Sequence, residues 1–176
     1  MKQNKKLIAV LLVAVLMVSA FALCACDKKC DHQFENNVCT KCGGKSIEVQ
    51  IVVTPSHNSA EGVTYFVETG MYGVVDTDTV EDLLVAVNNA EGALRLFEFE
   101  MSGTAVKKIG NLEGNTVTWD PYIAIFTSVE ADQGVGDWRE EITYITTTLA
   151  TSNFGVKEMH LEENAIIYFV LVEANW

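Results

Sequence analysis

Hydrophobic and polar residues alternate in short segments along the chain, and this alternation predicts β-strands. Residues 47–53 (IEVQIVV) alternate at their start and are rich in β-branched side chains, and residues 64–68 (TYFVE) predict a second strand. Residues 122–127 (YIAIFT) are almost wholly apolar, which is typical of a central strand buried on both faces. Residues 165–172 (AIIYFVLV) predict a closing strand. Further strands are expected in four segments: 94–100, 106–109, 116–119 and 138–148.

One segment, residues 79–89, has the periodicity of a helix instead. Its large apolar side chains repeat at the spacing that makes one helical face: Val80, Leu83, Leu84 and Val87. Asp78 is predicted as the N-cap, with Glu81 three residues later completing a capping box. The pattern as a whole predicts a mostly β domain with one main helix, of the α+β class.

The first 26 residues have the order of a secretory signal. Three lysines (Lys2, Lys5 and Lys6) are followed by an apolar run over residues 7–23. A retained transmembrane anchor is the alternative, but this run is at the short end of the roughly 20 apolar residues that a span needs.

The segment LCAC at residues 23–26 resembles the lipobox of bacterial lipoproteins, in which the last cysteine is modified. We therefore expect cleavage after residue 25 and a lipid on Cys26, with Cys24 as the poorer alternative because Leu23 is bulky beside that cut. We therefore expect an extracellular protein that is anchored by lipid to the outer face of the cytoplasmic membrane of a Gram-positive bacterium.

Three parts are predicted: a signal peptide (1–25), a cysteine-rich module with a Gly-Gly linker (26–46) and one globular domain (47–176).

The chain has 12 basic and 24 acidic residues, and removing the three leader lysines leaves 9 basic residues and a formal charge of −15. A protein of that sign is repelled by phosphate backbones, so nucleic acid is not an expected partner.

Three cysteines remain after Cys24 and Cys26 are assigned, and with one histidine they have the spacing of a small zinc knuckle. Cys30 and His32 form a C-x-H pair, and Cys39 and Cys42 form a C-x-x-C pair followed by two glycines. Three thiolates and one imidazole make a closed tetrahedral shell, which predicts a structural zinc site. So short a module has almost no core, and the metal would supply its folding free energy.

The alternative for this module is a disulfide between Cys30 and Cys39, because export favours oxidation. Three cysteines cannot all pair within one chain, and the histidine is correctly placed for a metal. The segment also resembles short Cys-x-His…Cys-x-x-Cys-Gly stretches in surface proteins of anaerobic Gram-positive bacteria.

No catalytic motif is present in the sequence: it has no G-x-S-x-G, no H-E-x-x-H and no glycine-rich phosphate loop. His57 lies in a polar turn sequence, and His160 is expected at the surface near a strand edge. We therefore do not expect an enzyme.

The order of segments in the large domain resembles the transcobalamin C-terminal-like domain, a β-grasp-type module of vitamin B12 carriers and bacterial surface proteins. The resemblance is carried by four stretches: residues 78–86 (DTVEDLLVA), 97–110 (FEFEMSGTAVKKIG), 119–126 (WDPYIAIF) and 154–169 (FGVKEMHLEENAIIYF). It implies a β-grasp-like sheet and a small ligand, with a corrinoid as a candidate.

Two functions follow as expectations. The first is a tethered domain that binds a small ligand and passes it to a transporter, with Trp119, Tyr122 and Trp138 as candidate ligand-binding residues because aromatic faces suit planar ligands. The second is a structural or protein-interaction module on the cell surface without a small ligand.

Overall fold

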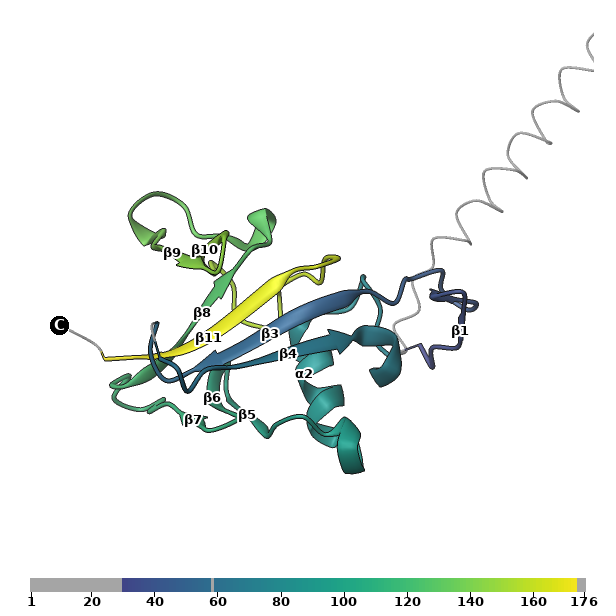
Figure 1. Cartoon of the computed structure of the whole chain (residues 1–176), viewed down its shortest axis with the longest axis horizontal. Helices are drawn as coiled ribbons and strands as arrows, with labels where there is room; N and C mark the ends of the chain where they lie inside the picture. The colour runs from purple at the N-terminus through teal and green to yellow at the C-terminus, as the bar shows by residue number, and fades with distance from the viewer. Residues whose placement is uncertain (1–29, 58, 174–176) are drawn as a thin grey trace, which may run out of the picture. The chain divides into compact units, whose positions relative to one another are not determined.

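The computed structural model describes residues 30–57 and 59–173 (Figure 1). The predicted signal peptide (1–25), and with it Cys24 and the predicted lipid site at Cys26, lie outside the described residues. The chain divides into two compact units, residues 1–31 and residues 32–176. Among the described residues, no helix has the length and apolar character needed to cross a bilayer.

A six-stranded sheet forms the centre of the second unit (Figure 1). Its strands, in order across the sheet, are β4 (Val63–Glu68), β3 (Glu48–Thr54), β11 (Ile166–Val172), β8 (Tyr122–Thr127), β10 (Thr147–Thr151) and β9 (Glu141–Tyr144). The two middle strands, β3 and β11, are parallel, and the other neighbours are antiparallel. The hairpin of β3 and β4, helix α2 and a last strand β11 that returns parallel to β3 make a mixed sheet with one main helix. The predicted α+β, mostly β class is therefore confirmed.

Strand β11 lies in the middle of the sheet, and this position accounts for its unbroken apolar run. Its successive side chains point to opposite faces. Ile167 and Phe169 join the core beneath helix α2 (Val80–Asn89), whereas Tyr168 and Val170 join a second core on the opposite face, to which β10 contributes Leu149. Side chains on both faces of β11 are therefore buried, and both described cores lie within residues 47–172.

Helix α2 packs its four predicted apolar side chains into the larger core, where each is fully buried. Its N-cap, however, is Thr79 and not Asp78. The Thr79 side chain accepts a hydrogen bond from the backbone N–H of Asp82, and the Asp82 carboxylate accepts one from the backbone N–H of Thr79. This capping box lies one residue later than predicted and leaves the Asp78 side chain available for another contact.

The remaining elements are short. They are a hairpin of β1 (Phe34–Glu35) and β2 (Val38–Cys39), a three-stranded sheet of β5 (Phe99–Ser102), β6 (Ala105–Ile109) and β7 (Leu112–Glu113), and four 3-10 turns: η1 (Thr69–Tyr72), η2 (Gly92–Leu94), η3 (Glu130–Asp132) and η4 (Gly136–Trp138).

Three strand predictions were wrong in extent. Residues 94–98 precede β5 without joining a sheet, residues 116–119 form a turn, and the segment 138–148 is divided into β9 and β10 by a turn at Ile145. Ile145 has a positive φ of 56°, which is rare for a β-branched residue, so the sequence carries no ordinary turn signal there.

Candidate functional site

The N-terminal hairpin brings the two predicted ligand pairs together. Asn36 and Asn37 connect β1 to β2 with φ values of 51° and 63°, as a tight hairpin turn of right-handed twist requires. Because Phe34 pairs with Cys39 in this hairpin, the residue two before Phe34, His32, lies beside the start of the C-x-x-C turn.

The C-x-x-C turn folds around the Cys39 sulfur. The backbone N–H of Gly43 donates to the carbonyl of Cys39 at 2.8 Å, and Gly43 has a φ of 79°, which glycine adopts without strain. The backbone N–H of Cys39 donates to the carbonyl of Gly44 at 2.8 Å and closes the loop. The turn thus directs both of its cysteines to one side.

Ligand atoms of Cys30, His32, Cys39 and Cys42 all lie within 4.8 Å of one another. The Nδ1 atom of His32 is 3.4 Å from the Cys39 sulfur and 3.5 Å from the Cys42 sulfur. A tetrahedral ion with a metal–nitrogen bond of about 2.0 Å and metal–sulfur bonds of about 2.3 Å would set such pairs about 3.5 Å apart. Because Nδ1 is almost equally close to both sulfurs, this geometry fits an ion shared by the three atoms better than a hydrogen bond to one sulfur. This Cys3His cluster can hold a metal ion.

Cys39 is the buried member of the cluster, with 1% of its surface exposed, whereas Cys42 is exposed. Both are free thiols. Burial raises the pKa of Cys39, but the backbone N–H of Cys42, the His32 ring and the backbone of Lys41 and Gln33 together lower this pKa to about 5. A cysteine that is a thiolate at neutral pH is ready to bind a metal.

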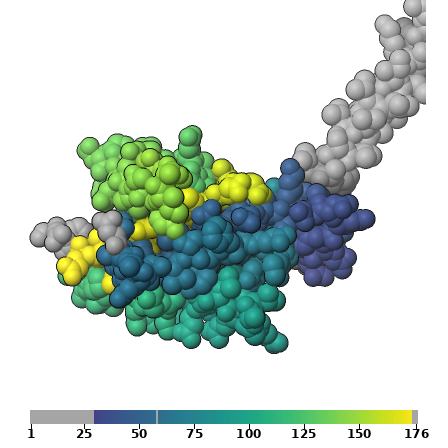
Figure 2. Space-filling view, viewed as in Figure 1, coloured from purple at the N-terminus to yellow at the C-terminus, as the bar shows by residue number. Residues whose placement is uncertain are grey.

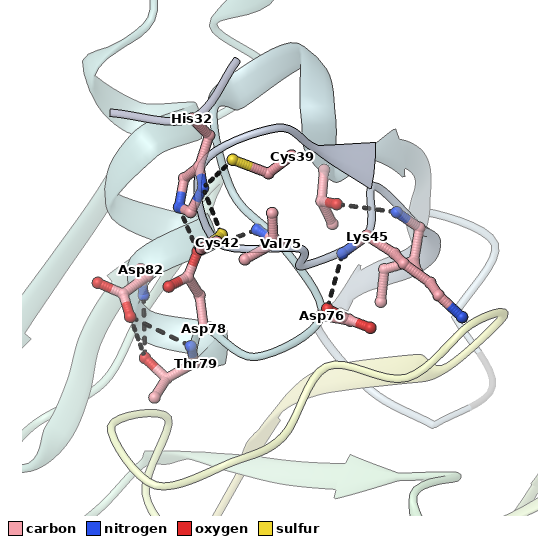
Figure 3. Close-up of polar contacts among 11 residues, drawn as sticks. His32, Cys39, Cys42, Lys45, Val75, Asp76, Asp78, Thr79 and Asp82 are labelled. Carbon is pink, nitrogen blue, oxygen red and sulfur yellow. Dashed lines mark hydrogen bonds and ion pairs between the residues drawn. The ribbon is translucent and has the colours of Figure 1, made fainter. Parts of the chain in front are cut away.

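The second ring nitrogen of His32 faces the large domain (Figure 3). Its Nε2 atom lies 3.4 Å from the Oδ2 atom of Asp78, and the His32 side chain is only 4% exposed. The same carboxylate oxygen accepts a hydrogen bond of 2.9 Å from the backbone N–H of Val75. Asp78 is therefore held in place by its own turn while it faces the imidazole.

The loop that follows the cluster packs on the same turn of the large domain. The backbone N–H of Lys45 donates to Asp76 at 2.8 Å, and Gly44 lies so close to Val75 that an added Cβ would be 2.7 Å from its Cγ2 atom. In the space-filling view, the surface of residues 32–46 is continuous with that of the domain (Figure 2). The hairpin is thus attached to the domain by side-chain and backbone contacts.

Two of the three aromatic residues predicted to bind a ligand line one cavity. It has a volume of about 170 Å³ between the start of β6, the start of β8 and the segment that follows β7. Trp119 and Tyr122 form part of its wall, and all its lining residues are uncharged: Thr104, Ala105, Val106, Gly114, Asn115, Thr116, Trp119, Tyr122, Ile123 and Ile125.

The loop that carries Trp119 is held rigidly by Asn115. The Asn115 side-chain oxygen accepts hydrogen bonds from the backbone N–H groups of Val117 and Thr118, and the backbone carbonyl of Asn115 accepts one of 2.9 Å from the backbone N–H of Trp119. Trp119 has a φ of 59°, a conformation that costs a bulky residue on the order of 1–3 kcal/mol. The loop therefore fixes a half-exposed indole at the cavity in a strained backbone conformation.

Trp138 lies elsewhere. It ends η4, is 84% exposed, and is not among the residues that line this cavity. The three predicted ligand-binding residues are thus divided between a cavity wall and a separate exposed position.

A pair formed by one buried carboxylate and one surface histidine gave no signal in the sequence. Asp132 is fully buried, and its carboxylate accepts hydrogen bonds from the His160 ring at 2.6 Å and from the His160 backbone N–H at 2.8 Å. The hydrogen bond to Asp132 and its negative charge raise the pKa of His160. The pair joins η3 to a segment 28 residues later, and His160 lies at the surface, 63% exposed. His57 is also at the surface, with its ring stacked on Tyr168.

No known protein family matches the chain, and no curated protein matches it in sequence.

Proposed function

We propose that this protein is an extracytoplasmic lipoprotein that binds a small ligand in the cavity beside Trp119 and Tyr122. The observation that supports it is the cavity itself, in which an indole and a phenol stand beside apolar walls and neutral polar groups. Aromatic and apolar walls with a few polar groups are the usual lining of a small-molecule site. The strained φ of Trp119 also supports a role, because such strain persists most often at functional positions.

The cavity size limits what enters it. An apolar cavity of about 150 Å³ holds a benzene molecule, whereas sites that enclose drug-sized ligands measure about 300–1,000 Å³. A cavity of about 170 Å³ would take one ring-sized group. A corrinoid, which the resemblance to transcobalamin C-terminal-like domains makes a candidate, would insert a part and leave the macrocycle outside. Because the protein would cover only one face of a corrinoid, we expect a dissociation constant on the order of micromolar or weaker.

A tethered binding protein also accounts for the N-terminal sequence. A lipid on Cys26 would leave three residues before Cys30, so that at most about 14 Å of chain separates the lipid-bearing residue from Cys30. The cavity is at the other end of the sheet, since Tyr122 pairs with Val172 at the end of β11 while the hairpin leads into the start of β3. A ligand bound there would be passed to a transporter or another surface protein. No step of this function requires catalysis.

The metal in this proposal is zinc, in a structural role. Three cysteines and one histidine are a donor set that zinc prefers, and four protein ligands leave no position for a reacting water. The metal would hold the hairpin folded on the turn before α2.

Titration with cobalamin tests the ligand proposal, followed by equilibrium dialysis, by the visible spectrum of the ligand and by tryptophan fluorescence. We expect weak saturable binding that Trp119→Ala abolishes and Trp138→Ala leaves unchanged. The two variants are matched because each removes one exposed indole, but only Trp119 lines the cavity. Haem and single-ring neutral compounds extend the test.

The absence of binding of any of these compounds at millimolar concentration would overturn the ligand proposal. The protein would then be better explained as a surface-interaction module.

A further inference from the structure

The position of Asp78 is not explained by the helix that follows it. Asp78 stands one residue before the N-cap, and Thr79 with Asp82 completes the capping box of α2 without it. Its Oδ2 atom is instead fixed by the backbone N–H of Val75 at 2.9 Å and points toward Nε2 of His32 at 3.4 Å (Figure 3). This carboxylate therefore has a defined orientation and a defined target outside the helix.

The imidazole of His32 offers its two nitrogens to different partners. Nδ1 is within 3.5 Å of two cysteine sulfurs, and Nε2 is turned to Asp78. A neutral histidine carries its proton on one nitrogen only, so a metal on Nδ1 requires the proton on Nε2. A separation of 3.4 Å is long for a hydrogen bond, but a movement of about 0.5 Å on metal binding would bring it to the usual length.

We propose that Asp78 is the positioning carboxylate of the metal site: it accepts the Nε2–H of His32 and thereby directs Nδ1 to the ion. Metal-bound histidines usually donate their second N–H to a carboxylate or carbonyl, which fixes the tautomer and makes the ligand nitrogen more basic. The proposal rests on the proposed zinc site. It adds that this site is completed by the large domain, because Asp78 belongs to the turn before α2 and not to the hairpin.

The test uses residues 27–176, which contain every described residue, expressed with zinc under reducing conditions. Zinc affinity is measured by competition with a chromophoric chelator for the wild type, Asp78→Ala, Asp78→Asn and Asp76→Asn. We expect Asp78→Ala to lower the affinity about 10- to 100-fold, as the loss of such a partner usually does. Asp78→Asn keeps an acceptor oxygen and should lose less.

Asp76→Asn is the matched control. It makes the same change of charge two residues away, and its amide oxygen can still accept the N–H of Lys45. Its zinc affinity should equal that of the wild type. A second measurement needs no variant: the ¹⁵N spectrum of wild-type His32 should show a metal-bound Nδ1 and a protonated Nε2.

The outcomes separate the two proposals. A wild type that takes up no zinc overturns the zinc site and the role of Asp78 with it. A wild type that binds zinc through Nε2 of His32, or a folded Asp78→Ala with wild-type affinity, overturns the role of Asp78 alone.

Discussion

The Nε2 atom of His32 and the Oδ2 atom of Asp78 lie 3.4 Å apart, and this contact joins the residues just before the N-terminal hairpin to the turn before α2. Asp78 can make it because Thr79 caps the helix. The loop that follows the hairpin makes two more contacts with the same turn, from Lys45 to Asp76 and from Gly44 to Val75. Folding of the hairpin and its packing on the domain are therefore expected to depend on each other.

The zinc content of the protein is the first test of the metal site. Residues 27–176 purified under reducing conditions should contain about one zinc per chain, as a closed four-ligand site requires. Cys39→Ser should lose the metal, because Cys39 is the buried ligand that contacts His32. The larger domain should remain folded by circular dichroism, since the described cores begin at Ile47.

The contrary result is specific as well. A metal-free wild type with a disulfide between Cys30 and Cys39, detected by mass spectrometry of peptides, would show that the cysteines do not serve a metal.

Substitution of Gly44 tests the packing of the hairpin on the domain. Gly44→Ala should lower the free energy of unfolding by about 1–3 kcal/mol, because its Cβ would lie 2.7 Å from Cγ2 of Val75. Val75→Ala makes room for that methyl group, so the double variant should lose less than the sum of the two single variants. Urea unfolding of the four proteins measures this coupling, and additive losses would mean that Gly44 and Val75 do not pack together in solution.

The identity of the helix cap is tested at Thr79. Thr79→Ala should cost about 1 kcal/mol of stability, because it removes the hydroxyl that accepts the Asp82 N–H. Thr77→Ala, at an exposed position two residues earlier, should change the stability by less than about 0.5 kcal/mol. Equal effects of the two substitutions in thermal unfolding would contradict the capping box.

The sequence predicts the larger elements well because their patterns are strong. The helical face of α2 follows from its periodicity, and the strands β8 and β11 follow from short apolar runs rich in β-branched and aromatic side chains. The N-cap was predicted one residue too early, because Asp78–Glu81 and Thr79–Asp82 both place a residue that can cap a helix three residues before a carboxylate. Only the contact between Asp78 and His32, 46 residues apart, distinguishes the two.

The candidate site is predictable only where its members are close in sequence. The C-x-H and C-x-x-C spacings predict the members of the Cys3His cluster, and Trp119 and Tyr122, predicted to bind a ligand, line one cavity. Asp132 and His160 could not be paired from sequence, because neither lies in a motif and the chain between them includes η4 and the strands β9 and β10. Long-range pairs of this kind are set by the topology of the sheet.

Lipidation is expected at Cys26. Mass spectrometry of the mature N-terminus should find a diacylated cysteine, and Cys26→Ser should release the protein from the membrane fraction. Cys24→Ser is the control, because it changes a neighbouring thiol of the same segment and should leave the protein anchored. Membrane-bound wild-type protein that still begins at Met1 would contradict cleavage and lipidation together.

The pair of Asp132 and His160 predicts a dependence of stability on pH. Because Asp132 raises the pKa of His160 above 6.5 in the folded protein, the folded state binds this proton more tightly than the unfolded state does. The resulting stabilisation is fully present below pH 6.5 and is lost as the pH rises through the folded pKa. It should not exceed about 1 kcal/mol, because the His160 side chain is 63% exposed and solvent screens the charge. His160→Gln should therefore destabilise the protein more at pH 5.5 than at pH 9 in urea unfolding. Comparison of the two proteins at each pH cancels the titration of the other carboxylates. A difference in stability that is the same at both pH values would mean that His160 contributes only its neutral hydrogen bond.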